Sequence, residues 1–186
     1  MKILGKGVID KDFREIFSSE VISLTGGVIA GTFLLGLVDK LELVPGLFIL
    51  LPGFLEMHGN IFGSLGARLG TLLHTKHIKP KFEHNKILLI NIFASILLLL
   101  VVSLFLGFVA YILNALIFDT YAPILIYIAI IAAIIALLVE MPLTIAATFW
   151  LFKKGYDPDD IMGPYITTMG DIISIVSLFI GILVVI

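Results

Sequence analysis

Residues 86–113 read KILLINIFASILLLLVVSLFLGFVAYIL, and this run has no charged side chain after Lys86. A helix needs about 20 consecutive apolar residues to cross the hydrocarbon core of a bilayer. The run therefore predicts a membrane-spanning helix. The rest of the chain agrees, because 60% of its 186 residues are hydrophobic and its mean hydropathy is +1.16. A soluble domain is usually about 45–50% apolar.

Working outward from this run, four more segments are long and apolar enough to be spans: 21–38, 45–74, 122–152 and 161–186. The sequence thus predicts an all-α integral membrane protein with five transmembrane helices per chain. Residues 10–19 are predicted to form a short interfacial helix before the first span, and a solvated helical tail is an equally good interpretation. We expect a cytoplasmic N-terminal segment, 1–19, and a five-helix membrane domain, 20–186.

Basic residues are concentrated in alternate connections. They gather in the N-terminal segment, between residues 68 and 86, and at Lys153 and Lys154, whereas the other two connections hold only Lys40. Because cytoplasmic loops carry the excess of lysine and arginine, we expect a multi-pass protein of the cytoplasmic membrane. Its N-terminus is expected inside the cell and its C-terminus outside.

Composition disfavours several classes of function. The chain has no cysteine, which excludes disulfides, thiol nucleophiles and thiolate metal sites. Its net charge is −2 and no basic stripe is present, so no nucleic-acid partner is expected. No nucleophile–base set or zinc motif is visible. The sequence therefore indicates neither an enzyme nor an organic cofactor.

Four polar side chains fall in the middle third of the predicted spans: Glu56, Asn60, Glu140 and Asp171. A carboxylate at the centre of a membrane-spanning helix costs at least about 2.5–3.5 kcal/mol, so it normally faces the bundle interior or an aqueous path. A cation pathway is the leading hypothesis. Glu140 remains open: it either binds a cation or protons, or pairs with Arg68 or with a neighbouring helix.

The polar residues follow helical spacing. Glu56, Asn60, Ser64 and Ala67 share one face of the second segment, while His58 points elsewhere and is expected to be hydrogen-bonded within the bundle. Glycines recur on that segment at positions 59, 63, 66 and 70, as in close helix packing. The fifth segment carries Thr167, Asp171 and Ser174 at i, i+4 and i+7, and Thr168 lies three residues before Asp171. The predicted metal ligands are Asp171, Asn60, Glu56, Glu140, Thr167, Thr168 and Ser174.

Oxygen ligands of this kind suit Mg²⁺, which keeps several waters and usually touches only one or two carboxylates. A twofold homodimer would bring two copies of Asp171 together, and their charges would match one divalent ion. The lack of thiols argues against zinc, copper or iron as the main substrate.

Two stretches resemble a known family. Residues 51–71, LPGFLEMHGNIFGSLGARLGT, resemble the second membrane helix of MgtE-type magnesium transporters, closest to the archaeal and eukaryotic branch. Residues 155–171, GYDPDDIMGPYITTMGD, resemble the start of that family's fifth membrane helix, with Asp-Pro, Gly-Pro and Thr-Thr-x-x-Asp elements. The resemblance extends from about residue 19 to the end of the chain and concerns the membrane domain alone.

The resemblance implies a homodimer with a Mg²⁺ pathway between protomers, lined by the second and fifth helices. The family's central ion-binding aspartate falls on Asp171, its Gly-Asn position on Gly59 and Asn60, and its arginine on Arg68. Bacterial members carry N-terminal cytoplasmic domains that sense magnesium and that this sequence lacks. Gating by cytosolic magnesium is therefore not expected, unless a separate cytoplasmic regulatory protein supplies it or the short N-terminal helix serves as a plug.

Two other classes stay open beside divalent-cation transport. A proton-coupled transporter of an organic solute would use the same carboxylates as proton carriers. A non-conducting assembly subunit of a membrane complex would use them only for packing. The expected partners are a second copy of the chain, membrane lipid and Mg²⁺, and transport of other divalent ions is a variant of the first class.

Overall fold

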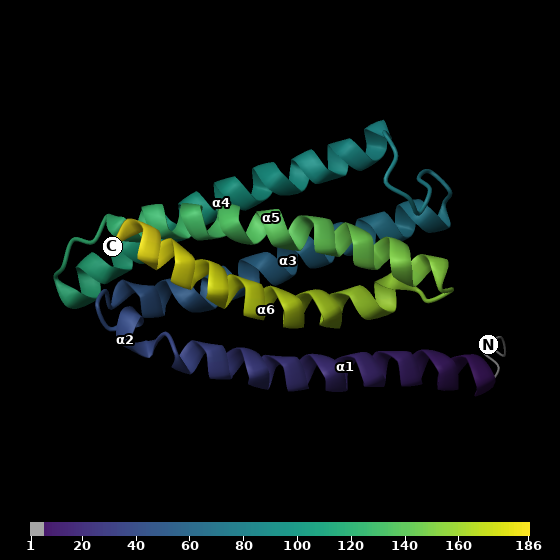
Figure 1. Ribbon diagram of the computed structural model, residues 1–186, viewed down its shortest axis with the longest axis horizontal. Helices are drawn as coiled ribbons and strands as arrows, with labels where there is room; N and C mark the ends of the chain where they lie inside the picture. The colour runs from purple at the N-terminus through teal and green to yellow at the C-terminus, as the bar shows by residue number, and fades with distance from the viewer. Residues whose placement is uncertain (1–5) are drawn as a thin grey trace.

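The computed structural model describes residues 6–186, apart from the side chains of residues 6–12, 15, 40 and 160. Within that range the only regular elements are helices, and there is no strand. Five long helices lie side by side in an elongated bundle, and α1 begins at the end of the bundle opposite to the end of α6 (Figure 1). The helices are α1 (Lys6–Leu35), α2 (Val38–Leu41), α3 (Gly46–His74), α4 (Lys86–Phe118), α5 (Ile124–Lys153) and α6 (Pro158–Val185).

Each predicted segment corresponds to one long helix. The expected interfacial helix and the first span form one continuous helix, α1. No glycine or proline occurs between residues 8 and 25 to break it. The rings of Phe13 and Phe17 stack one turn apart within this stretch, with centroids 5.9 Å apart.

Four of the described helices are long and apolar enough to cross a membrane, in the ranges Ile16–Leu35, Lys86–Phe118, Ile124–Lys153 and Ile161–Val185. Helix α3 is not among them, although its 29 residues span roughly 43 Å at 1.5 Å per residue. Its polar residues Glu56, His58, Asn60 and Arg68 lower its mean hydropathy. Length and composition thus identify four spans where five were predicted.

Helix α3 nevertheless lies within the bundle. It packs against α4, α5 and α6, while α1 packs mainly on α6. One face of α3 is largely apolar and forms much of the core, through Leu50, Phe54, Phe62, Leu65 and Leu69, with His58 buried among them. Glu56, Asn60 and Ser64 lie on another, exposed face of α3.

Small residues allow the closest helix approaches. A β-carbon at Gly107 of α4 would lie 2.9 Å from the Cα of Ile126 on α5, so only glycine fits there. Gly26 of α1 likewise leaves no room for a β-carbon against the side chain of Thr168 on α6. These contacts fix the positions of the outer helices relative to α5 and α6.

The start of α6 is capped by an aspartate side chain. Asp157 is the N-cap, and its carboxylate accepts a hydrogen bond from the backbone N–H of Asp159 at 3.0 Å. Asp159 lies against Gly70 of α3.

This placement gives a stability prediction for Asp159→Asn. Burial raises the pKa of Asp159, and the charge of Asp157 raises it further, against the opposing effect of His74. The folded protein therefore binds this proton more tightly than the unfolded chain. The ionised carboxylate costs stability once the pH rises from about 4, the ordinary aspartate pKa, through the raised value.

We expect Asp159→Asn to raise the melting temperature at pH 7.5 and to have no effect below pH 4. The gain should be about 1–2 °C, because Asp159 is largely exposed and solvent screens its charge. The measurement is Trp150 fluorescence during heating in detergent at both pH values. Glu42→Gln, in the exposed turn before α3, is the matched control, and an equal gain from it would contradict the explanation.

Candidate functional site

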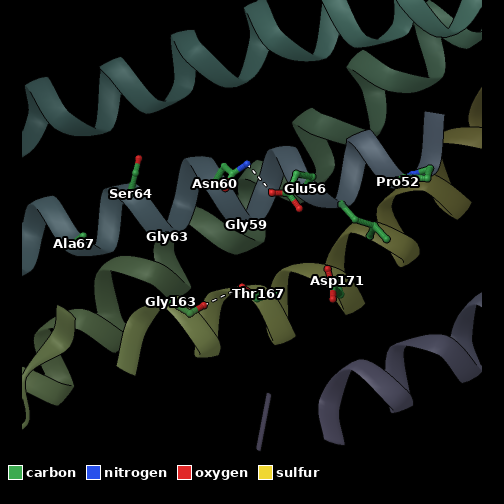
Figure 2. Close-up of a pocket in the computed structure, with 11 residues that line it drawn as sticks. Pro52, Glu56, Gly59, Asn60, Gly63, Ser64, Ala67, Gly163, Thr167 and Asp171 are labelled. Carbon is green, nitrogen blue, oxygen red and sulfur yellow. Dashed lines mark hydrogen bonds between the residues drawn. The ribbon is translucent and has the colours of Figure 1, made fainter. Parts of the chain in front are cut away.

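A groove of about 700 Å³ runs along the polar face of α3, between α3 and α6. Figure 2 shows the residues that form it. Helix α3 contributes Pro52, Leu55, Glu56, Gly59, Asn60, Gly63, Ser64 and Ala67, and α6 contributes Gly163, Thr167 and Asp171. The predicted shared face of Glu56, Asn60, Ser64 and Ala67 is thus confirmed.

The two walls are antiparallel and lie closest toward the His74 end of α3. A β-carbon at Gly66 would lie 3.2 Å from the Cβ of Met162, whereas one at Gly59 would lie 3.9 Å from the Oγ1 of Thr167. At Gly63 nothing lies within 4 Å of that position. The predicted glycine stripe therefore has two uses, because Gly66 packs against α6 while Gly63 opens the groove.

The groove is acidic. Its eleven lining residues are neutral or acidic, and its two carboxylates, Glu56 and Asp171, come from opposite walls. The two are close enough for their charges to interact. Asp171 is half-buried and Glu56 is exposed to the groove. Such a surface attracts cations and repels anions.

The two lining hydroxyl groups donate their protons to carbonyl oxygens of their own helices. The hydroxyl of Thr167 donates to the carbonyl oxygen of Gly163 at 3.0 Å, and that of Ser64 donates to the carbonyl oxygen of Ile61 at 3.1 Å. The amide nitrogen of Asn60 donates to Oε1 of Glu56 at 3.0 Å (Figure 2). Apart from the second N–H of the Asn60 amide, what remains for a ligand is a set of oxygen acceptors, the atoms that bind a hard cation or the protons of its water shell.

Glu140 does not line the groove. It is buried on α5 and faces α6, where a β-carbon at Gly170 would lie 3.5 Å from its Oε1. Neither of its carboxyl oxygens has a hydrogen-bond partner among the described residues. The expected alternative of a pair with Arg68 was wrong, because Arg68 donates instead to the Oγ of Ser95 on α4 at 2.8 Å. Glu140 thus lies against Gly170, the residue that precedes Asp171 on α6.

Thr168 and Ser174 also lie outside the groove. Thr168 packs on Gly26 of α1 and donates its hydroxyl proton to the carbonyl oxygen of Pro164 at 3.0 Å. Ser174 is fully buried. The structure therefore brings together four of the seven predicted ligands, Asp171, Asn60, Glu56 and Thr167, and separates Glu140, Thr168 and Ser174 from them. As metal ligands all seven stay predictions.

Within the described part of one chain, no three histidine, aspartate or glutamate side chains come together as a metal-binding group. His58 is buried between the rings of Phe54 and Phe62, and its Nδ1 lies 2.8 Å from the carbonyl oxygen of Phe54. The expectation that His58 is hydrogen-bonded within the bundle is confirmed. His74 lies 3.3 Å from Asp157 at the far end of the groove walls.

Sequence reasoning missed Gly163 as part of the site. Its carbonyl oxygen accepts the hydrogen bond from the hydroxyl of Thr167. Because Gly163 has no side chain, α6 leaves space in the groove that Ser64 and Ala67 also line. The Gly-Pro pair at 163–164 was a usable signal. A helical threonine can donate its hydroxyl proton to the carbonyl oxygen four residues earlier, and Gly163 lies four residues before Thr167.

Comparison with known proteins gives one match. A family model described as MgtE, divalent cation transporter, matches residues 51–181. The matched range contains nearly all of α3, the whole of α4 and α5, and most of α6, and therefore both walls of the groove. No curated protein and no solved structure matches the chain.

Proposed function

The chain belongs to the MgtE family of divalent cation transporters, and we propose that it carries Mg²⁺ across the cytoplasmic membrane along the α3–α6 groove. The main support for this proposal is the kind of polar group that lines the groove. Two carboxylates face it, while the hydroxyl protons of Thr167 and Ser64 are donated to backbone carbonyls. A polar surface that presents two carboxylates and mainly oxygen acceptors suits a cation better than an anion.

The size of the groove favours a hydrated ion. A water molecule occupies about 30 Å³ of liquid, and the groove volume is about 700 Å³. Mg²⁺ dehydrates reluctantly and usually keeps several waters while it contacts one or two carboxylates. In this proposal Asp171 attracts the ion, and the oxygens of Asn60 and Thr167 accept hydrogen bonds from its water shell.

A second copy of the chain completes the pathway in this proposal. The groove is open along one side, and carboxylates facing hydrocarbon are costly. A twofold axis along the groove would cover both polar faces at once and place two Asp171 side chains opposite each other. Two charges of −1 then match one divalent cation.

The membrane arrangement follows from the same packing. Helix α3 lies against α4, α5 and α6, and we infer that it crosses the membrane with the four apolar helices. Five crossings place the two ends of the chain on opposite sides, as the opposite positions of the α1 start and the α6 end suggest (Figure 1). The basic connections assign the N-terminus to the cytoplasm.

The test is Mg²⁺ uptake into liposomes that contain the purified chain and a Mg²⁺-sensitive dye. We expect uptake that saturates with Mg²⁺ and is absent from empty liposomes. Proton movement without dependence on divalent ions would favour the organic-solute transporter instead. A chain that moves neither ion would favour the assembly-subunit alternative.

The dimer is tested separately with Ser64→Cys, since the chain has no cysteine of its own. Ser64 lines the groove, so a short bis-maleimide should link two copies of this variant into a covalent dimer in membranes. Ala94→Cys, at an exposed position on α4, is the matched control and should stay monomeric. Equal linking of both variants, or of neither, would contradict a dimer built around the groove.

A further inference from the structure

We propose that Glu56 is a positioning residue that holds the amide group of Asn60 with its oxygen toward the transported ion. The inference rests on the proposed function and deepens it, because it assigns Glu56 a role different from direct ion binding. It starts from the hydrogen bond between the two side chains, 3.0 Å from Nδ2 of Asn60 to Oε1 of Glu56 (Figure 2).

An asparagine amide has two unlike ends. Its nitrogen carries two hydrogen-bond donors, and its oxygen only accepts. A 180° rotation of the amide group therefore places the nitrogen, which repels a cation, where the oxygen, which binds one, had been. An ionised carboxylate accepts hydrogen bonds and donates none. The contact with Glu56 therefore requires the nitrogen on the Glu56 side and directs the oxygen of Asn60 away from Glu56. A hydrogen bond to a charged acceptor is also roughly twice as strong as a neutral one.

The other lining side chains explain why Asn60 needs such a partner. Thr167 and Ser64 each donate their single proton to a backbone carbonyl of their own helix. Asn60 donates to a side chain instead, and Glu56 is that side chain. The two residues are four positions apart on α3, so the arrangement forms within one helix and does not depend on a second copy.

Asp171 provides the contrast. None of the described residues donates a hydrogen bond to its carboxylate, which faces the groove from α6. Glu56 already accepts one bond, whereas Asp171 keeps all its acceptor positions free. In this proposal the two carboxylates of the groove have different roles. Asp171 faces the ion, and Glu56 orients the neutral side chain of Asn60 beside it.

The test compares single and double variants of Glu56 and Asn60 in the liposome assay. The measured quantity is the Mg²⁺ concentration that gives half-maximal uptake, called half-saturation below. Glu56→Gln still offers an amide oxygen to Asn60, so we expect half-saturation within about threefold of the parent, whereas Glu56→Leu should weaken it about tenfold or more. In Asn60→Asp both terminal atoms of the side chain are oxygens, so no partner is needed to turn an oxygen toward the ion. In that background Glu56→Leu should change half-saturation by less than about threefold.

Two outcomes would overturn the proposal. A Glu56→Gln variant as weak as Glu56→Leu would mean that the charge of Glu56, and not its hydrogen bond, serves the ion. Equal losses from Glu56→Leu in the parent and in the Asn60→Asp background would mean that Glu56 does not act through Asn60. Melting temperatures of all variants exclude loss of folding as the cause.

A readout without transport separates this proposal from the proposed function. The side-chain NH₂ resonances of Asn60, assigned by NMR in detergent, report the hydrogen bond directly. They should shift in Glu56→Leu and much less in Glu56→Gln. Unshifted resonances in Glu56→Leu would refute the positioning role. Shifted resonances in a chain that moves no Mg²⁺ would refute the proposed function alone.

Discussion

Asp171→Asn is expected to lower divalent cation flux about 100-fold or more, because loss of the charge that faces a poorly solvated cation costs roughly 3–5 kcal/mol. Asp171 faces the groove from α6 and accepts no hydrogen bond from the described residues. Asparagine has nearly the same shape, so α6 should keep its packing. The measurement is Mg²⁺ uptake into liposomes that contain equal amounts of parent and variant.

The matched control is Asp119→Asn, the same chemical change in the exposed turn after α4. Asp119 has a φ of 51°, a left-handed conformation that asparagine also adopts readily. Flux through this control should equal that of the parent. Undiminished flux through Asp171→Asn, from a variant with an unchanged elution volume and melting temperature, would remove Asp171 from the pathway.

Much of the fold follows from the sequence because apolar runs and their charged ends are local signals. The predicted segments 45–74, 86–113 and 122–152 begin within two residues of α3, α4 and α5. The continuity of α1 was missed for a physical reason. An interfacial helix and a span differ in their surroundings, while the backbone of α1 meets no helix breaker at which to separate them.

The site was predicted less completely because helical spacing tells which residues share a face but not what covers that face. Thr167 and Ser174 are seven residues apart and lie on the same side of α6. Thr167 lines the groove and Ser174 is fully buried. Thr168 is directed toward α1 by the gap at Gly26. These differences arise from packing between helices, which no pattern within one helix contains.

The buried Glu140 also shows that spacing along one helix does not reveal which neighbouring helix a side chain meets. Its position in the middle of a predicted span correctly marked an unusual carboxyl group. Its spacing from Thr144 gave no information about α6, where Gly170 leaves the room that the carboxyl group occupies. A glycine on one helix thus admits a polar group of another, and only the assembled bundle shows the pair.

Helix α3 combines a core-forming face with a groove-lining face. Its apolar face supplies core residues such as Phe54 and Leu65, and its polar face supplies most of the groove. Its mean hydropathy is therefore too low for a typical span. The helix is held instead by contacts with α4, α5 and α6, which is the usual arrangement for polar segments at membrane depth.

Gly63→Phe should obstruct the groove and lower flux at least about tenfold, because an apolar ring in a narrow aqueous path both fills it and repels water. Nothing lies within 4 Å of a β-carbon at Gly63, so the ring enters open space and the protomer should keep its melting temperature. The change leaves Glu56, Asn60 and Asp171 in place. A loss of flux would therefore locate the pathway without altering any proposed ligand.

Gly31→Phe is the matched control, since Gly31 on α1 also has nothing within 4 Å of its β-carbon position and lies outside the groove. Its flux should equal that of the parent. Gly107→Phe marks the opposite case, because a β-carbon there would lie 2.9 Å from the backbone of α5, and this variant should lose stability. Normal flux through Gly63→Phe would mean that ions take another route, since the ring would then occupy a groove that no ion uses.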